Sequence, residues 1–261
     1  MKSEKILIKV NKLSEIKAYQ KIGIANFLFG LKGYSIEDPV FILQEIKSVQ
    51  GNIYLDLNKM LDTKGIEAFK ILIKDLSFVK GIFFDDLGLY QVLKDTNIPL
   101  IWHQSHFVLN SLSINWWLKR VKSVCLSNEL TKDEITVILN QCSKPIVLNV
   151  LGRNQAMYSR RYLLSSFSRA KGLKTMKKAR LATNNGHQFL AKETIDGTTL
   201  YYYNYFNYLP LTKSINDDKI MLYYINSTGL TPKKAINLIN GGKMVSNEDF
   251  LNHRTIYKLE D

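Results

Sequence analysis

The most regular feature of the chain is a repeated alternation between short apolar segments and longer segments with helical periodicity. The apolar segments are almost continuously hydrophobic, as expected for strands buried on both faces of a parallel sheet. Seven of them precede residue 151, at residues 6–10, 22–29, 53–57, 81–84, 99–102, 123–126 and 146–150. An eighth strand is predicted at residues 219–225.

Amphipathic segments separate these strands and are predicted to form helices. They lie at residues 13–20, 38–49, 63–76, 89–94, 111–119 and 131–140. The clearest start is at Thr131, because Glu134 three residues later completes a capping box. Asp38 before Pro39 indicates a similar start. One more helix is expected to begin near residues 231–232.

Strands and helices that alternate in this way indicate repeated βαβ units. Eight strands fit a closed (β/α)8, TIM-barrel-like α/β fold better than an open doubly wound sheet, which is the alternative. No G-x-G-x-x-G or Walker-type loop follows a predicted strand, and this weakens a nucleotide-binding interpretation of the open sheet. We expect one barrel-like domain over residues 1–261, with a β-hairpin insertion at residues 180–212 before the last strand.

The expected insertion contains two strong turn signals. One turn is predicted at residues 184–186, and strands at 188–194 and 199–205 flank a second turn at residues 196–197. The aromatic run at its end favours a hairpin packed over the barrel, and a base-stacking platform is the alternative. The run comprises Tyr201, Tyr202, Tyr203, Tyr205, Phe206 and Tyr208.

Positive charge is concentrated in one stretch of the chain. Residues 135–192 contain 11 Lys and Arg and no Asp or Glu, whereas the other 203 residues contain 25 basic and 23 acidic side chains. The stretch therefore carries +11 of the formal net charge of +13. Such a field attracts a polyanion or an anionic substrate. If the polyanion is RNA, the residues expected to contact its backbone are Arg169, Lys171, Lys174, Lys177, Lys178 and Arg180.

Polar residues follow several predicted strands, and in a parallel barrel the carboxyl ends of the strands meet at one open face. Together these residues predict a polar pocket. They are Asn58, Lys59, Asp85, Asp86, His103, Gln104, Asn128, Glu129 and Arg153. We take His103 and Glu129 as the candidate catalytic residues.

The imidazole of His103 suits proton transfer at neutral pH, and a structural role for this histidine is an equal alternative. His106 lies three residues further on. Because no third ligand stands at a fixed spacing from this pair, we predict no metal site.

Residues 151–165, LGRNQAMYSRRYLLS, suggest a site for an anion. We expect Ser159 to cap a helix whose first turn holds Arg160 and Arg161, so that free N–H groups and guanidinium groups together bind a carboxylate or phosphate. Pairing of these arginines with distant acidic residues is the alternative. The buried contacts of this helix are expected from Leu163, Leu164 and Phe167. The predicted substrate-binding residues are Arg153, Tyr158, Ser159, Arg160 and Arg161.

These motifs resemble the peptidase U32 family. That family typically has a Ser-Arg-Glu-Leu segment, here SNEL at residues 127–130, then a short strand ending in a glycine turn, here at Gly152. A Tyr-Ser-Arg motif that opens a helix follows in the family, and this chain has it at residues 158–160. The similarity extends over about residues 24–240 and is most specific over residues 124–165.

The resemblance implies a role in hydroxylation. Members of the family include tRNA and rRNA hydroxylases and ubiquinone-pathway hydroxylation factors, several with an iron–sulfur cluster on cysteines. This chain has only two cysteines, and Tyr162 stands where cluster-bearing members tend to have one, so four ligands are not supplied. It is similar to the short, cysteine-poor members of low-GC Gram-positive bacteria, which are associated with prephenate-dependent formation of 5-hydroxyuridine at the tRNA wobble position.

We therefore expect a tRNA modification protein, either the hydroxylase or a subunit of it. Its partners are expected to be tRNA, a small anionic carboxylate with prephenate as the candidate co-substrate, and a longer U32-family subunit. No cofactor bound by cysteines is expected.

Two other functions stay open. One is a U32-type peptidase or collagenase-like hydrolase, with Ser127, Ser159 and Cys125 as candidate nucleophiles. The other is a non-catalytic barrel that binds RNA or a partner. Because no signal peptide and no membrane-spanning apolar run is found, we expect a cytoplasmic protein without a membrane partner.

Overall fold

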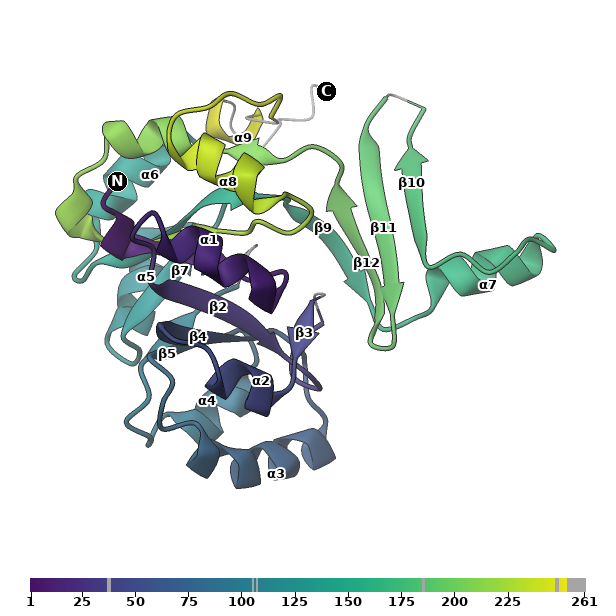
Figure 1. Cartoon of the computed structure of the whole chain (residues 1–261), viewed down its shortest axis with the longest axis horizontal. Coiled ribbons are helices and arrows are strands. Elements are labelled where there is room, and N and C mark those ends of the chain that lie inside the picture. Colours follow the sequence, from purple (N-terminus) through teal and green to yellow (C-terminus); the bar gives the residue numbers. More distant parts are fainter. Residues whose placement is uncertain (37–38, 105, 107, 185, 247–248, 253–261) are drawn as a thin grey trace.

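The computed structural model describes residues 1–36, 39–104, 106, 108–184, 186–246 and 249–252. Eight parallel strands close into a barrel, because β1 pairs with both the second and the last strand of the series. In chain order they are β1 (Ile6–Lys9), β2 (Asn26–Leu31), β4 (Asn52–Leu57), β5 (Gly81–Phe84), β6 (Leu100–Trp102), β7 (Ser123–Leu126), β8 (Ile146–Gly152) and β14 (Ile220–Ile225). The predicted (β/α)8, TIM-barrel-like α/β fold is confirmed (Figure 1).

Helices follow most of the barrel strands. They are α1 (Ile16–Gln20), α2 (Leu43–Lys47), α3 (Thr63–Leu72), α4 (Leu87–Leu93), α5 (Ser111–Leu118), α6 (Lys132–Gln141) and α8 (Pro232–Ile239), with a short α9 (Asp249–Asn252) at the end. Single 3-10 turns occur at Ser3–Lys5, Leu13–Glu15, Ile73–Asp75, Leu209–Lys213 and Asp217–Lys219. The capping box predicted at Thr131 is present. No helix of the described residues is long and apolar enough to cross a bilayer.

The helix predicted for residues 38–49 begins later than expected. Asp38 lies outside the described residues, but Val40–Phe41 form strand β3, which pairs with Gly30 and Leu31 of β2. Since these residues are held in extended pairing, α2 begins only at Leu43.

The barrel interior is filled by an apolar plug to which each strand contributes one side chain. These side chains form a packing cluster of their own with Tyr224, whereas their sequence neighbours belong to a larger cluster. Because strand side chains alternate between two faces, the larger cluster lies between the strands and the helices. The plug residues are Leu7, Leu28, Tyr54, Phe83, Ile101, Cys125, Val147 and Leu222.

A four-stranded antiparallel sheet stands beside the barrel in the order β10-β11-β12-β9 (Figure 1). Its elements are β9 (Gln155–Ser159), α7 (Leu163–Ala170), β10 (Lys178–Ala182), β11 (Gln188–Thr194) and β12 (Gly197–Tyr202). The chain returns to the barrel through β13 (Phe206–Asn207), which pairs with β8. We call residues 155–202 the basic arm. The predicted hairpin is present as β11 and β12, within a sheet that also includes β9 and β10.

The predicted helix start at Ser159 is wrong. Residues 155–159 are extended as β9 and pair with β12, with Met157 opposite Leu200. Helix α7 therefore begins only at Leu163, and Arg160 and Arg161 precede it. Of the three apolar residues expected to be buried by this helix, Leu164 is buried and the other two, Leu163 and Phe167, are exposed.

The aromatic run divides between the two parts of the molecule. Tyr205, Phe206 and Tyr208 are buried in the barrel cluster, as a hairpin packed over the barrel requires. Residues 201–203 are half-buried at the end of β12 and beyond it.

Candidate functional site

A mostly polar layer lies directly above the apolar plug. Residues two positions after a plug residue face the interior again, because side chains alternate along a strand, and here they fall at the carboxyl ends of the strands. They include Lys9, Asp56, Asp85, His103, Ser127, Asn149 and Tyr224. The sequence thus places its polar inward positions at the face where (β/α)8 barrels carry their sites.

This layer forms the floor of a cavity of about 280 Å³ at the barrel mouth, which we call the mouth cavity. Six residues of the predicted rim set line it. They are Asn58, Asp85, His103, Gln104, Asn128 and Arg153. Gln155 and Tyr158 of β9 line the same cavity, so the basic arm contributes one of its walls.

Three rim residues have other roles. Asp86 caps α4, accepting a hydrogen bond from the Gly88 N–H at 2.6 Å. Lys59 forms an ion pair with Asp196 of the basic arm at 2.5 Å, which ties the arm to the barrel. Glu129 is not among the residues that line the cavity, and its Oε1 lies 2.9 Å from Nδ1 of His106.

A buried ion pair joins two strands under the cavity. Nζ of Lys9 lies 3.2 Å from Oδ2 of Asp56, and both side chains are almost completely buried. Removing either partner leaves an uncompensated charge in the barrel, which is strongly unfavourable. The two opposite charges therefore cancel each other beneath the cavity.

Two deeply buried acceptors of the cavity wall have no hydrogen-bond partner among the described residues. They are Oδ1 of Asp56 and Oδ1 of Asn149, whose residues are 2% and 8% exposed. Buried polar atoms are normally hydrogen-bonded, so each indicates a place for a donor from outside the chain. Both residues line the mouth cavity.

The two histidines occupy different environments. The His103 ring lies edge-on to Phe83 and to Tyr224, with centroids 5.9 Å from each, at the top of the plug. His106 is paired with Glu129, as described above. The predicted catalytic residues His103 and Glu129 are thus near the same mouth, but the hydrogen bond of Glu129 is to the neighbouring histidine. Their catalytic role stays a prediction.

The predicted substrate-binding residues are not brought into one pocket. Arg153 lines the mouth cavity, where its guanidinium lies 3.9 Å from the Tyr205 ring centroid and its Nε donates to the Tyr203 carbonyl. Arg160 lines a second cavity, and Arg161 is exposed. Ser159 accepts a hydrogen bond from the Arg161 N–H, so its hydroxyl stabilises the turn before α7.

The second cavity, which we call the cleft, has a volume of about 600 Å³ and lies between the barrel and the basic arm. It shares Ile36, Met60 and Tyr158 with the mouth cavity, so the two adjoin. The Tyr158 hydroxyl donates to the Asp196 carbonyl at 2.6 Å. The charged residues of the cleft are Lys32, Lys59, Arg160 and Asp196.

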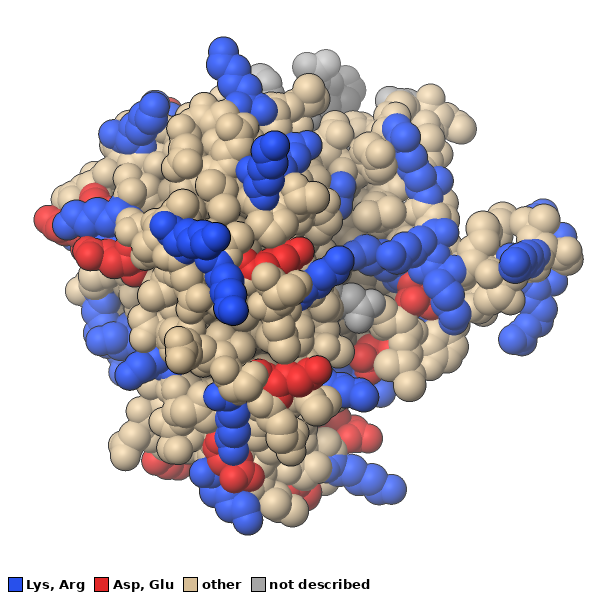
Figure 2. Space-filling view, viewed as in Figure 1, with Lys and Arg blue, Asp and Glu red and all other residues tan. Residues whose placement is uncertain are grey.

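The basic arm carries 9 Lys and Arg and 2 acidic residues, and both acids are engaged in ion pairs. Figure 2 shows basic side chains spread over this part of the molecule, with few acidic side chains beside them. Six of its cations form no hydrogen bond or ion pair through their side chains with any described residue. They are Arg160, Arg161, Arg169, Lys171, Lys174 and Lys178. The other two residues of the predicted RNA-binding set are engaged, since Lys177 pairs with Glu193 and Arg180 contacts Gln188 and the Tyr203 ring.

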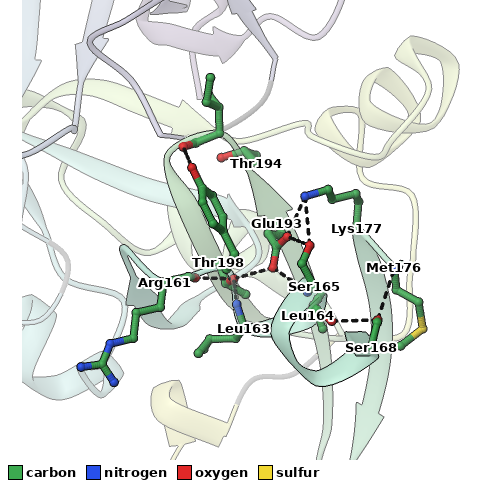
Figure 3. Close-up of polar contacts among 12 residues, drawn as sticks. Arg161, Leu163, Leu164, Ser165, Ser168, Met176, Lys177, Glu193, Thr194 and Thr198 are labelled. Carbon is green, nitrogen blue, oxygen red and sulfur yellow. Dashed lines mark hydrogen bonds and ion pairs between the residues drawn. The ribbon is translucent and has the colours of Figure 1, made fainter. Parts of the chain in front are cut away.

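A single buried carboxylate holds α7 against the sheet (Figure 3). Glu193 of β11 accepts hydrogen bonds from the Ser165 N–H at 3.0 Å, from the Ser165 hydroxyl and from Lys177 Nζ at 2.7 Å. Thr198 of β12 accepts from the Leu163 N–H at 3.0 Å. Two N–H groups of the first turn, those of Leu163 and Ser165, thus find acceptors on other strands, and these acceptors replace a local cap.

The pKa of the Glu193 carboxyl is low. Burial opposes its ionisation, but the hydrogen bonds from Lys177 and Ser165 outweigh burial and hold the pKa at about 2. Glu193 is therefore ionised at neutral pH.

The cysteines do not fit an iron–sulfur cluster. Cys125 belongs to the barrel plug and Cys142 to the outer cluster, so they lie in separate cores. Burial raises the pKa of both thiols, that of Cys142 to about 11. Neither is a thiolate at neutral pH, and two thiols in different cores cannot ligate one cluster. In the described residues, no group of three or more His, Cys, Asp or Glu side chains is placed to hold a metal.

Sequence reasoning missed Lys9, Asp56, Asn149 and Glu193. The first three were hidden inside predicted strands, where a count of positions in steps of two from the plug would have found them. Glu193 carried no signal, because its partners are 16 and 28 residues away.

Replacing Lys9 by Met is expected to destabilise the fold by about 3–5 kcal/mol, because Asp56 then stays buried without its partner. The double variant Lys9→Met/Asp56→Leu removes both charges and should recover much of that loss. Urea unfolding of the wild type, both single variants and the double variant measures the coupling. If the two single substitutions changed the free energy of unfolding additively, the assignment of a buried ion pair would be contradicted.

Glu193→Gln is expected to lower the free energy of unfolding by about 1–3 kcal/mol at pH 7, since charge-assisted hydrogen bonds are lost. The folded pKa is below the unfolded value of about 4.3, so this stabilisation is present above pH ~4.3 and is lost as the pH falls toward 2. Thermal unfolding at pH 7 and pH 3 should show a smaller difference between variant and wild type at pH 3. Glu67→Gln, which removes an exposed pair, is the control; an equal effect from it would contradict the assignment.

Comparison with known proteins agrees with the motifs. The family model described as Peptidase family U32 matches residues 34–175, which include the mouth strands β4 to β8, β9 and α7. Searches of curated proteins and of solved structures found no match. Because the matched segment covers more than half of the 261 residues, the chain belongs to peptidase family U32.

Proposed function

We propose that this protein modifies tRNA, as the hydroxylase or a hydroxylase subunit that forms 5-hydroxyuridine at the wobble position. The observation that carries the RNA part is the basic arm, which has six cations without partners among the described residues and whose strand β9 lines the polar cavity at the barrel mouth. The uridine and hydroxylation parts rest on the resemblance to the short, cysteine-poor members of the family.

The arm supports binding to a phosphate backbone for a physical reason. Cations that already have acidic partners contribute little to binding, because those pairs must break first. Here both acids of the arm are paired with Lys177 and Lys59, whereas the six exposed cations named above form no hydrogen bond or ion pair through their side chains with any described residue. Aromatic rings next to Arg180 and Lys192 add surfaces on which bases can stack.

A small carboxylate, with prephenate as the candidate, is proposed as co-substrate. Arg160 and Arg161 are candidate ligands for this carboxylate or for a phosphate of the RNA, because neither guanidinium has a partner among the described residues. Tyr158 and Ser159 hold the turn that presents them. Arg153 at the mouth is the third candidate.

A longer U32-family subunit is proposed as the partner that supplies redox chemistry, since the two buried cysteines cannot hold a cluster. In this proposal His103 or Glu129 moves protons at the mouth, and the protein works in the cytoplasm.

The peptidase alternative has less support at the level of residues. Cys125 is buried in the plug with its pKa raised, and the hydroxyl of Ser159 accepts from a backbone N–H in the turn before α7. Ser127 is almost completely buried, and its Oγ accepts from the Glu129 N–H. A peptide library cleaved by the purified protein, with loss of cleavage in Ser127→Ala or Ser159→Ala, would reverse this order.

Binding of tRNA is expected to weaken steeply with salt. If six cations contact phosphates, the slope of log Kobs against log salt is about −4, and Lys171→Gln/Lys174→Gln/Lys178→Gln should reduce it by about 2. Fluorescence anisotropy with labelled tRNA measures both slopes. A triple variant at Lys64, Lys74 and Lys94, remote from the arm, is the charge-matched control and should leave the slope nearly unchanged. Affinity that does not depend on salt would rule out the phosphate contacts.

Deletion of the gene is expected to abolish or strongly reduce 5-hydroxyuridine in tRNA, as measured by nucleoside mass spectrometry. Reconstitution with tRNA and prephenate, with and without a longer family member, then separates enzyme from subunit. Activity of the chain alone would assign it the chemistry, and activity only of the mixture would assign it a subunit role. Unchanged 5-hydroxyuridine in the deletion strain would refute the proposal.

A further inference from the structure

We propose that the mouth cavity receives a single extruded nucleobase, that Asn149 recognises the edge of this base, and that the adjoining cleft holds the phosphate next to it. The inference rests on the proposed RNA-binding function and divides the site into a formally neutral part and a positively charged part.

The charges of the two cavities differ. Around the mouth cavity, Asp56 and Asp85 are balanced by Arg153 and by Lys9 beneath the floor, so the formal sum is zero with neutral histidines. Around the cleft, Lys32, Lys59 and Arg160 outnumber Asp196, so the formal sum is +2. A neutral group is therefore favoured in the mouth cavity and an anion in the cleft.

The open hydrogen-bonding atoms of the mouth require donors on the ligand. Oδ1 of Asp56 and Oδ1 of Asn149 are acceptors without partners among the described residues, and both residues are more than nine-tenths buried. A carboxylate or phosphate offers only further acceptors and leaves both atoms unsatisfied. A ligand with N–H groups satisfies them.

Asn149 adds selectivity. Its carboxamide presents an acceptor and two donors side by side, and no hydrogen bond within the described chain occupies them. A nucleobase edge with an N–H beside a carbonyl or ring nitrogen is complementary to that arrangement, in the way that Asn and Gln read base edges elsewhere. The residue stands on β8, opposite Tyr224 in the parallel register, so its position is fixed by the barrel.

The mouth cavity has the size of one base and adjoins the cleft. About 280 Å³ accommodates one base and excludes a base pair, so the base has to leave its stack to enter. The His103 ring lies at the floor, and Tyr158 stands where the mouth cavity meets the cleft. A nucleotide thus spans the two cavities, with its base inside and its phosphate near Lys32 and Arg160.

The test uses an RNA stem-loop and matched stem-loops in which one loop nucleotide at a time lacks its base but keeps its phosphate. Anisotropy with the full-length wild type is expected to show about tenfold weaker binding at one loop position. Asn149→Asp, which replaces the amide donors with acceptors at constant size, should remove this difference. Lys32→Gln/Arg160→Gln should weaken binding of all the RNAs equally and reduce the salt slope.

Controls separate the inference from folding and from the proposed function. Asn240→Asp introduces the same change on the surface and should bind like the wild type, and Asn149→Ser gives a second variant should Asn149→Asp fold poorly. Binding without a base-dependent position in the wild type, or with that dependence intact in both Asn149 variants, overturns the inference and leaves the proposed function standing. Absence of any RNA binding overturns both.

Discussion

The site depends on one geometric constraint, the alternation of side chains along the closed strands of the barrel. Once a plug of one apolar residue per strand fills the interior, the next inward position on each strand is two residues further toward the open face. In this chain those positions hold Lys9, Asp56, Asp85, His103, Ser127 and Asn149. The barrel therefore cannot bury its plug without also gathering these groups at its mouth. The charges of Lys9 and Asp56 cancel, Arg153 at the rim balances Asp85, and the unpartnered oxygens of Asp56 and Asn149 leave the layer open to a ligand.

The basic arm depends on a second constraint. Helix α7 has no local cap, so N–H groups of its first turn need hydrogen-bond acceptors from other strands. Helix α7 has only eight residues and depends on tertiary contacts for stability. Glu193 and Thr198 provide those contacts from β11 and β12. Gly197 lets the β11–β12 turn pack closely against Ser159, because a Cβ atom added at residue 197 would lie 2.2 Å from the Ser159 carbonyl oxygen. One acid thus anchors the helix while the surrounding cations stay available. Lys59 and Asp196 place the arm against the mouth, so that the surface suited to a polyanion and the polar cavity adjoin.

Periodicity and short motifs were sufficient for the barrel, because parallel strands buried on both faces are continuous apolar runs and the capping box at Thr131 is local. They were insufficient wherever the decisive partner lies far along the chain. The sequence around residues 155–159 predicts a segment that leads directly into a helix. Pairing with β12 instead makes these residues a strand and moves the helix start to Leu163. Arg153 and Arg160 are seven residues apart in sequence but line different cavities for the same reason. The rim residues were found because strand ends are readable, whereas Asn149 is inside a strand that reads as wholly apolar apart from this one residue.

The central claim is that RNA crosses the basic arm and reaches the barrel at its mouth. Photo-crosslinking of tRNA with 4-thiouridine at the wobble position, followed by peptide mass spectrometry, tests it most directly. The account predicts crosslinks from that nucleotide to residues around the mouth and the cleft, with Tyr158 the foremost candidate because it lines both. Crosslinks confined to the opposite side of the molecule, or to the helices α3 and α4, would contradict it.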